Sequence, residues 1–293
     1  MLINVAKKLL KWLPDKPYLR LYYFAKLKKN LNFRNPKSFN EKLQWLKVYD
    51  RKDVYTTMVD KLEAKEFVKE RIGQEYIIPT LGVWERVEDI DFAALPKKFV
   101  LKCTHDSGGL VVCRDKSKLD VDAAKKTLKK SLSTNFYYWT REWPYKNVKP
   151  RIIAETYMED QKQQSGLIDY KFYCFDGEPK FLYISKGLED HATANISFLN
   201  LDWSFAPFQR SDYKGFETLP EKPAGYDKML EIAVKLSRDT SFLRVDLYEI
   251  DGRIYFSEMT FTPCGGTMRF VPMEWDNEIG KILTLPGKTE KGN

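Results

Sequence analysis

The stretch that decides the fold runs from Leu243 to Phe261 and reads LRVDLYEIDGRIYFSEMTF. Apolar and polar residues alternate on both sides of Asp251-Gly252, and an Asp-Gly pair in that setting is typical of a tight β-hairpin turn. The same pattern occurs earlier in the chain, in DYKFYCFDGEPKFLYIS over residues 169–185. Two such hairpins predict antiparallel sheet.

The register of the later hairpin decides whether its acidic side chains meet. A two-residue turn pairs residue 250 with 253, which places Asp246 and Glu258 on opposite faces. A three-residue loop with a bulge at Gly252 instead places Asp246, Glu258 and Arg244 on one face. Two carboxylates at that spacing suit a divalent cation, and an arginine beside them suits a phosphate or an oxyanion. The alternative is a surface Arg–Glu pair next to an unrelated aspartate.

The rest of the chain reads as blocks of helices and strands. Ser38-Phe39-Asn40-Glu41 has the form of a capping box and predicts the start of a helix. Periodicity predicts further helices over 3–13, 56–71, 121–132, 225–238 and 276–283, and strands over 99–103, 110–113 and 151–158. This order, with antiparallel hairpins, predicts an α+β fold.

Charge is distributed unevenly along the chain. The formal net charge is +8, but residues 1–52 hold 14 Lys and Arg against 3 Asp and Glu, which leaves 35 against 38 in the remainder. A body of that composition argues against a nucleic-acid-binding protein. Residues 1–30 are instead expected to contact an anionic membrane surface or an anionic glycan. The alternative is a helix packed on the domain with its lysines in water.

Sequence features also bear on the compartment. No apolar run approaches the roughly 20 residues that span a bilayer, and the N-terminus lacks the charge order of a secretory signal. The four cysteines have no C-x-x-C spacing and the chain has two histidines, which disfavours a zinc site and a disulfide framework. All four cysteines are expected to be free and buried among strands. We therefore expect a cytoplasmic protein, in peripheral contact with the membrane at most.

Two segments have the form of nucleotide-binding elements. Lys102 ends an apolar strand and is followed by His105-Asp106-Ser107-Gly108-Gly109, where an ammonium and backbone N–H groups suit phosphates. The chain has no G-x-x-x-x-G-K-[ST] motif, and a plain hairpin loop is the alternative. Residues 152–159 form an apolar strand that ends in Glu155-Thr156-Tyr157-Met158, which suits a purine; the alternative is an ordinary strand end.

Taken in order, these segments resemble the ATP-grasp superfamily over about residues 56–285. Lys61, within Asp60–Lys65, resembles the first nucleotide lysine of the family. Lys102 resembles the second lysine, and Ser107, Gly108 and Gly109 resemble the flexible loop that covers the phosphates. The resemblance further implies an adenine hinge at Glu155, Tyr157 and Met158, a ribose-binding acid at Asp169, and a phosphate contact at Lys171.

The later hairpin resembles the metal-binding hairpin of the same superfamily. The resemblance assigns Mg²⁺ to Asp246, Glu258 and Thr260, and the tetrahedral intermediate to Arg244. Thr260 departs from the asparagine usual there, which puts the second metal ion in doubt. The loop Thr262-Pro263-Cys264-Gly265-Gly266 would supply an oxyanion hole from Gly265 and Gly266. A nucleophilic role for Cys264 is disfavoured because an acyl phosphate needs no thiol.

The resemblance implies two α+β subdomains with antiparallel sheets that sandwich ATP, preceded by a basic helical region. The expected division is residues 1–55, 56–155 and 156–287, with a tail at 288–293. Within the superfamily, FSEMTFTPCGG and DYKFYCFDGEPKF resemble the teichuronopeptide-biosynthesis branch, which accompanies capsule and exopolysaccharide genes. The implied activity is ATP-dependent carboxylate–amine ligation, joining an amino acid or amino alcohol to a uronic acid.

Two other classes of function remain as alternatives. A metal-dependent glycosyltransferase also pairs acidic residues, but the D-x-D triplets at Asp89 and Asp120 fall in a loop and at a helix start. A non-enzymatic polyanion-binding protein would need basic residues over its whole surface, which the acidic body does not provide.

Overall fold

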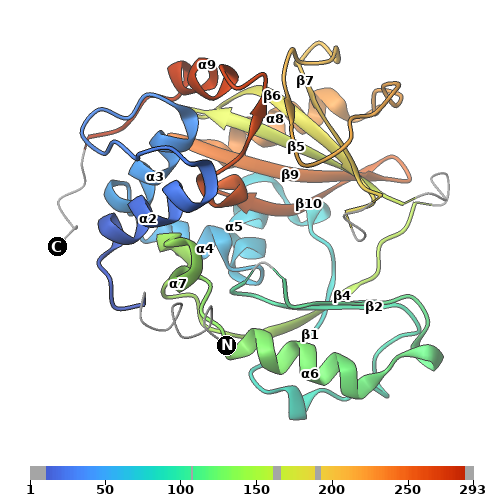
Figure 1. The fold of residues 1–293 in the computed structure, drawn as a ribbon. Coiled ribbons are helices and arrows are strands. Elements are labelled where there is room, and N and C mark those ends of the chain that lie inside the picture. Colours follow the sequence, from blue (N-terminus) through green and yellow to red (C-terminus); the bar gives the residue numbers. More distant parts are fainter. Residues whose placement is uncertain (1–10, 107, 161–165, 189–192, 288–293) are drawn as a thin grey trace.

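The structure is a computed structural model that describes residues 11–106, 108–160, 166–188 and 193–287. Figure 1 shows the arrangement of its elements. The helices are α2 (Asp15–Leu27), α3 (Phe39–Tyr49), α4 (Val54–Val59), α5 (Glu63–Ile72), α6 (Val121–Leu132), α7 (Tyr137–Thr140), α8 (Tyr226–Ser237) and α9 (Trp275–Ile282). The strands are β1 (Thr80–Trp84), β2 (Phe99–Cys103), β3 (Leu110–Cys113), β4 (Ile152–Thr156), β5 (Ile168–Phe175), β6 (Glu178–Lys186), β7 (Asn195–Leu199), β8 (Gln209–Arg210), β9 (Phe242–Ile250), β10 (Arg253–Thr260) and β11 (Phe270–Val271).

Two antiparallel sheets organise the molecule. The larger has five strands in the order β10-β9-β5-β6-β7, and the smaller has four in the order β1-β4-β2-β3. Every strand pair within them is antiparallel. In Figure 1 the small sheet lies with α6 at the bottom of the molecule and the large sheet lies above it. The α+β fold with antiparallel sheets, predicted from the two hairpins, is confirmed.

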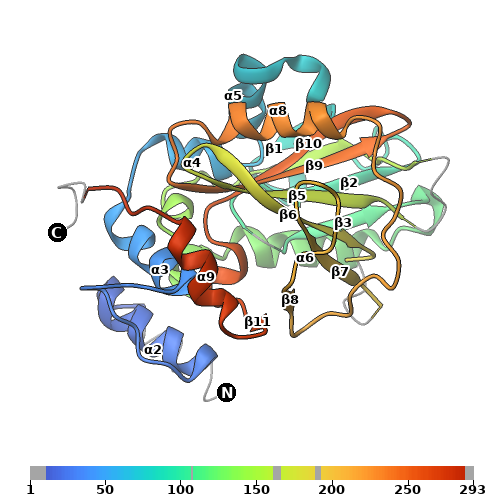
Figure 2. The same ribbon diagram turned by 90° about the horizontal axis from the view of Figure 1, so that it is seen from above.

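The two faces of the large sheet are covered by different helices. Leu243, Val245 and Leu247 of β9 are fully buried against α8 and α5. On the opposite face, Tyr173 and Phe242 pack against Phe39 of α3 in an aromatic cluster. Figure 2 shows α8 and α5 on one side of the sheet and α3 with α9 on the other. The aromatic cluster takes one part of this second face, and the next positions along the same strands carry the charged residues described below.

The helix predicted over 56–71 is wrong, because the chain breaks there. α4 ends at Val59 and α5 begins at Glu63, with Asp60 in an extended conformation between them. The Asp60 carboxylate accepts the N–H of Leu62 at 2.9 Å, so it caps the start of α5. Lys61 therefore lies in a turn and not on a helix.

The N-terminal segment is part of the packed molecule. The capping box is present as predicted, since Ser38 accepts the N–H of Glu41 and the Glu41 side chain accepts the N–H of Ser38. α2 was not predicted, and its Leu19 and Tyr23 are buried in the aromatic cluster. The helix predicted over 3–13 falls mainly outside the described residues. Among the helices that the structure describes, none has the length and hydropathy of a membrane span.

One expectation about the cysteines is wrong. Cys103, Cys113 and Cys174 are free and buried in strands, as predicted, but Cys264 is exposed. It lies in a 3₁₀ turn (Pro263–Gly266) that follows β10. The turn has left strand geometry by this point, which leaves the residue exposed, although desolvation of its thiol near Arg210 and Arg244 raises the pKa of Cys264.

Candidate active site

The acidic residues of the later hairpin meet through a bulge that neither considered register contained. Asp251 and Gly252 have positive φ values of 50° and 78° and form a two-residue turn, so Ile250 pairs with Arg253. The pairing then shifts between Phe256 and Glu258, which sets Glu258 directly opposite Asp246. A bulge restores the shared face that a two-residue turn would otherwise abolish. Of the two registers considered, the two-residue turn is the one present, and the common face of Asp246 and Glu258 arises from the bulge before Glu258 and not from one at Gly252.

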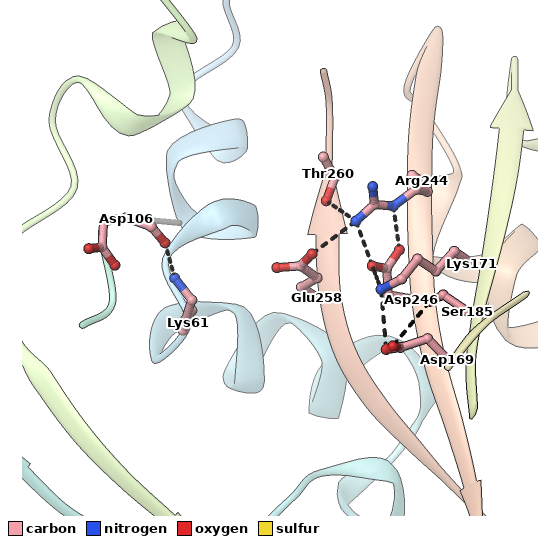
Figure 3. A network of polar contacts seen from close by, with 9 residues as sticks. All are labelled: Lys61, Asp106, Asp169, Lys171, Ser185, Arg244, Asp246, Glu258 and Thr260. Carbon is pink, nitrogen blue, oxygen red and sulfur yellow. Dashed lines mark hydrogen bonds and ion pairs between the residues drawn. The ribbon is translucent and has the colours of Figure 1, made fainter. Parts of the chain in front are cut away.

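Arg244 is the centre of a charged cluster on this face (Figure 3). Its guanidinium donates to both oxygens of Asp246, at 2.7 and 2.6 Å, and its Nη2 also donates to Glu258 at 2.9 Å. The same Nη2 donates to the Thr260 hydroxyl at 3.0 Å. Arg244 therefore connects all three residues that were assigned to the metal.

β5 extends the cluster on its other side. Lys171 pairs in register with Asp246, and its Nζ lies 2.6 Å from the Asp246 carboxylate and 3.2 Å from Asp169. Ser185 of β6 donates to Asp169 at 3.2 Å. Asp169, expected at the ribose, thus bonds within the same row of charges, as Figure 3 shows.

Burial and charge oppose each other at Asp246. Its side chain is completely buried, which favours the neutral acid, but Arg244 and Lys171 outweigh that effect and hold the pKa of Asp246 below its usual value. Burial likewise acts to lower the pKa of Lys171, and Asp169 and Asp246 reverse it, so that the pKa lies well above its usual value. The cluster is therefore a set of fixed, mutually compensated charges.

Lys61 faces this cluster from the other side of a pocket. Its ammonium donates to the backbone carbonyl of Asp106, and burial lowers its pKa although Asp106 and Glu258 act in the opposite sense. The pocket is lined by Met58, Val59, Lys61, Ala64, Tyr145, Phe256, Ser257, Glu258 and Met259. Tyr145 was not predicted to line the pocket, because nothing in the sequence around it distinguishes it from a core tyrosine.

A second charged cluster lies on the small sheet. Glu155 of β4 is buried between two ammonium groups, with Lys102 of β2 and Lys65 of α5 each 2.6 Å away. Burial favours the neutral acid, but Lys102 and Lys65 outweigh it and lower the pKa of Glu155. Lys65 also donates to the Ile78 carbonyl at 2.8 Å. Lys65 was not predicted as a site residue, although it lies four residues after Lys61 in the Asp60–Lys65 segment.

The remaining nucleotide-binding candidates lie near this cluster. Gly108 is exposed, and the N–H of Gly109 donates to the Asp106 carboxylate at 3.0 Å; Ser107 falls outside the described residues. Tyr157 and Met158 follow β4 and are half-buried. The Tyr157 hydroxyl accepts from Arg114 at 3.1 Å.

The loop after β10 has an unusual backbone. Cys264, Gly265 and Gly266 have positive φ values of 53°, 61° and 68° in succession. A β-carbon on Gly265 would lie 2.7 Å from the hydroxyl oxygen of Tyr22 of α2, so only glycine fits without a shift. The predicted oxyanion-hole glycines are therefore held against the N-terminal helices, and the N–H of Gly265 donates to the Thr262 carbonyl at 2.9 Å within the turn.

The model of the TupA-like ATP-grasp family matches residues 41–284 of this chain, which is most of its length and includes both charged clusters. The chain belongs to the TupA-like ATP-grasp family. Its fold is accordingly an ATP-grasp fold. The matched region begins within α3, ahead of residue 56, where the resemblance in the sequence analysis began.

Solved structures of other ATP-grasp proteins are distantly similar. A D-alanine–D-alanine ligase from Bacillus anthracis has 17% identity and a TM-score of 0.41, over 77% of this chain and 60% of the ligase. A RimK domain protein from Sphaerobacter thermophilus has 12% identity and a TM-score of 0.42, over 80% and 70% of the two chains. D-cycloserine synthetase DcsG has 16% identity and a TM-score of 0.40, over 78% and 71%. The chain thus spans less than two thirds of the first of these, and no curated protein matches the sequence.

The donor set of this family member fits magnesium better than zinc. Glu258 is 43% exposed at its side chain and uses one oxygen for Arg244, which leaves the other open to the pocket. Asp246 is enclosed, with three donors on its two oxygens. Within the described ranges, no three His, Cys, Asp or Glu side chains gather as a metal site. Mg²⁺ is commonly bound by one or two carboxylates together with substrate phosphates and water. Glu258 can supply one such carboxylate directly, whereas Asp246 would first have to give up a bond to Arg244 or Lys171.

Proposed function

We propose that the protein is an ATP-dependent carboxylate–amine ligase. The observation that carries this proposal is the row of Arg244, Asp246 and Glu258, with Lys171 beside it and Lys61 across the pocket. Hard carboxylate oxygens next to fixed cations suit a magnesium nucleotide, and phosphoryl transfer depends largely on such positioning and charge neutralisation.

The proposed reaction has two steps. A carboxylate oxygen of the substrate attacks the γ-phosphorus of ATP, the bond to the β,γ-bridging oxygen breaks, and ADP leaves. The amine nitrogen then attacks the carbonyl carbon of the acyl phosphate, inorganic phosphate leaves, and the nitrogen gives up a proton. The first step makes the carboxylate electrophilic, which the second step requires.

Each charged residue has a proposed task in these steps. Lys61, Lys102 and Lys171 bind phosphate oxygens, and Arg244 stabilises the negative charge of the tetrahedral intermediate. Mg²⁺ held by Asp246 and Glu258, with Thr260 as an optional ligand, would neutralise phosphate charge. The Ser107–Gly109 loop covers the phosphates, Glu155, Tyr157 and Met158 hold the adenine, and Asp169 takes the ribose. Gly265 and Gly266 would supply N–H groups to the oxyanion in exchange for the bonds that these groups make within the turn.

The proposed carboxylate is a uronic acid of a capsular polysaccharide or exopolysaccharide, or of its sugar-nucleotide precursor. The proposed amine is an amino acid or an amino alcohol. Support for this choice comes from the TupA-like family and from the teichuronopeptide-type segments of the sequence. No nucleic acid is proposed as a partner.

ADP release from purified protein with ATP, magnesium and a panel of uronates and amines tests the proposal. Glu258→Gln should lower turnover at least about 100-fold, because it removes a carboxylate that would hold Mg²⁺ against the phosphates. Glu178→Gln is the matched control, since Glu178 is an exposed acid of the other hairpin, bonded to Lys180. Full activity of Glu258→Gln would contradict the assignment of Mg²⁺ to Glu258. Protection against unfolding by a UDP-sugar and not by ATP would favour the glycosyltransferase alternative.

We also propose a cytoplasmic location with peripheral contact at an anionic membrane surface, made by residues 1–30. In the described part of this segment, Leu21 and Phe24 of α2 are 57% and 52% exposed. Arg20 and Lys28 are exposed beside them. An apolar strip flanked by basic residues suits the headgroup region of an anionic bilayer.

A further inference from the structure

Helix α3 carries three buried polar side chains on one face. Asn40, Gln44 and Lys47 follow one another at intervals of four and three residues, so they form a line along the helix. All three are almost completely buried. Polar groups at this depth destabilise a protein unless they are hydrogen-bonded. A helix that served only to fill the core would carry apolar residues at these positions.

All three side chains bond to the backbone of the loop that follows β10. Asn40 bonds to both backbone polar groups of Met268: its Nδ2 donates to the Met268 carbonyl at 2.8 Å, and its Oδ1 accepts the Met268 N–H at 2.9 Å. Gln44 Nε2 donates to the carbonyls of Gly265 and Gly266, at 3.0 and 2.7 Å. Lys47 Nζ donates to the Gly265 carbonyl at 2.7 Å.

The conformation of this loop needs support from outside. Three successive positive φ values are unfavourable, above all for Cys264, which has a β-carbon. The contact with α3 is close, because a β-carbon on Gly266 would lie 2.5 Å from Gln44 Nε2. Gln44 also leaves its Oε1 buried with no hydrogen-bond partner among the residues that the structure describes. An arrangement that leaves a polar atom unpaired points to a role other than stability.

The bonds from α3 also decide which way the loop's N–H groups point. In a trans peptide the carbonyl and the N–H lie on opposite sides. Because the Gly265 carbonyl points to Gln44 and Lys47, the N–H of Gly266 points away from α3, towards the Pro263 carbonyl of the same 3₁₀ turn. The N–H of Gly265 donates in the same way to the Thr262 carbonyl at 2.9 Å. An ammonium on the carbonyl oxygen polarises the peptide and strengthens its N–H as a donor.

We propose that Gln44 and Lys47 are positioning residues of the ligase: they hold the Pro263–Gly266 turn, and with it the end of β10 that carries Glu258 and Thr260, in place beside Arg244. This inference rests on the proposed function and deepens it, because it makes a helix of the basic N-terminal region part of the catalytic machinery. Lys47 also donates to the Thr140 carbonyl at 2.8 Å, so it ties the turn to α7.

The test compares Lys47→Met and Gln44→Met with Lys42→Met. Lys42 lies on the same helix, but its Nζ donates to the Leu283 carbonyl at 2.7 Å, away from the loop. Methionine matches these side chains in length, and burying an apolar group in place of a buried charge is commonly tolerated. We expect the first two variants to lower kcat for amide formation about 10- to 100-fold and to leave the KM for ATP within about twofold. Lys47→Arg should recover part of kcat.

A second measurement is independent of catalysis. Cys264 lies in the turn and is exposed, while the other three cysteines are buried, so dithionitrobenzoate should label Cys264 first in the folded protein. Labelling is followed at alkaline pH, because desolvation raises the pKa of this thiol. Lys47→Met and Gln44→Met should each change this labelling rate by more than about threefold, and Lys42→Met should not. A thermal unfolding transition checks that each variant is folded. If Lys47→Met does not fold, the result for Gln44→Met decides the test.

The outcomes separate the two proposals. A wild-type protein that releases no ADP contradicts the proposed function, while the labelling rates still decide whether α3 sets the turn. Labelling rates that change less than threefold in both variants, or equally in Lys42→Met, overturn the positioning role. So does an unchanged kcat in an active enzyme.

Discussion

The completely buried carboxylate of Asp246 links stability to chemistry at a single residue. Asp246→Asn leaves the cations of Arg244 and Lys171 without their shared partner, and breaking a buried ion pair from one side is strongly destabilising. We expect the free energy of unfolding to fall by about 3 kcal/mol, measured by urea denaturation. Glu258→Gln removes a much more exposed acid of the same cluster and should stay within about 1 kcal/mol of the wild type. Equal losses of unfolding free energy in the two variants would contradict the difference in burial between Asp246 and Glu258.

Lys47 gives a pH-dependent prediction at the same scale. Burial lowers its pKa from 10.5 to about 8, with Glu142 acting in the opposite sense. Between these two values the unfolded chain binds more protons than the folded one, so the folded state gains stability as the pH rises from about 8 towards 10.5 and loses it as the pH falls back over the same range. From pH 7 to about pH 9.5, the wild type should gain about 2 kcal/mol of unfolding free energy relative to Lys47→Met. Parallel stability curves for the two proteins would show that Lys47 is not buried as described.

The break between α4 and α5 leads to a prediction for an element. Asp60 caps α5 through the Leu62 N–H and bonds to Arg151 at 2.8 Å. Asp60→Ala removes both contacts and should cost about 2 kcal/mol of unfolding free energy. Asp53→Ala is the matched control, because Asp53 precedes α4 without a side-chain cap, and should cost less than about 0.5 kcal/mol. A loss in Asp53→Ala as large as in Asp60→Ala would contradict the assigned cap.

The sequence predicts elements well where the signal is local. The predicted turns at Asp176-Gly177 and Asp251-Gly252 are present. Both positions of such a turn have positive φ values, which Asp and Gly adopt more readily than most residues. The bulge before Glu258 has no such local signal, since Ser257 is an ordinary strand residue. The break at Asp60 was missed for a similar reason: the apolar periodicity continues across it, and Arg151, which bonds Asp60, is distant in sequence.

The same distinction holds for the candidate site. Arg244, Asp246 and Glu258 were predictable because one hairpin brings them together over a short stretch of chain. Lys65, Tyr145 and the α3 side chains reach the site only through contacts between segments far apart in sequence. Gln44 and Gly266, for example, meet only because α3 packs beside the end of β10. A pattern within one segment cannot predict a contact of this kind.

At the scale of the whole molecule, the basic N-terminal region has one side that is packed into the core and another that is exposed to solvent. α3 and the inner side of α2 pack into the aromatic cluster of the large sheet, with Leu19 and Tyr23 buried there. Removing residues 1–30 would therefore unfold part of the molecule and could not report on substrate or membrane binding alone. The outer side of α2 is not packed against the core, so substitutions there can test what the excess of positive charge binds without unfolding the molecule.

Sedimentation with lipid vesicles tests the proposed membrane contact. The protein should bind vesicles with about 30% phosphatidylglycerol and not pure phosphatidylcholine, because the basic residues around Leu21 and Phe24 need an anionic surface. Leu21→Asp with Phe24→Asp should reduce binding at least about tenfold, since both side chains lose their place in the headgroup region. Val234→Asp on α8, 44% exposed and far from α2, is the matched control and should bind as the wild type does. If the double variant binds as well as the control, Leu21 and Phe24 do not make the membrane contact. If the wild-type protein does not bind anionic vesicles at all, the proposed membrane contact is wrong.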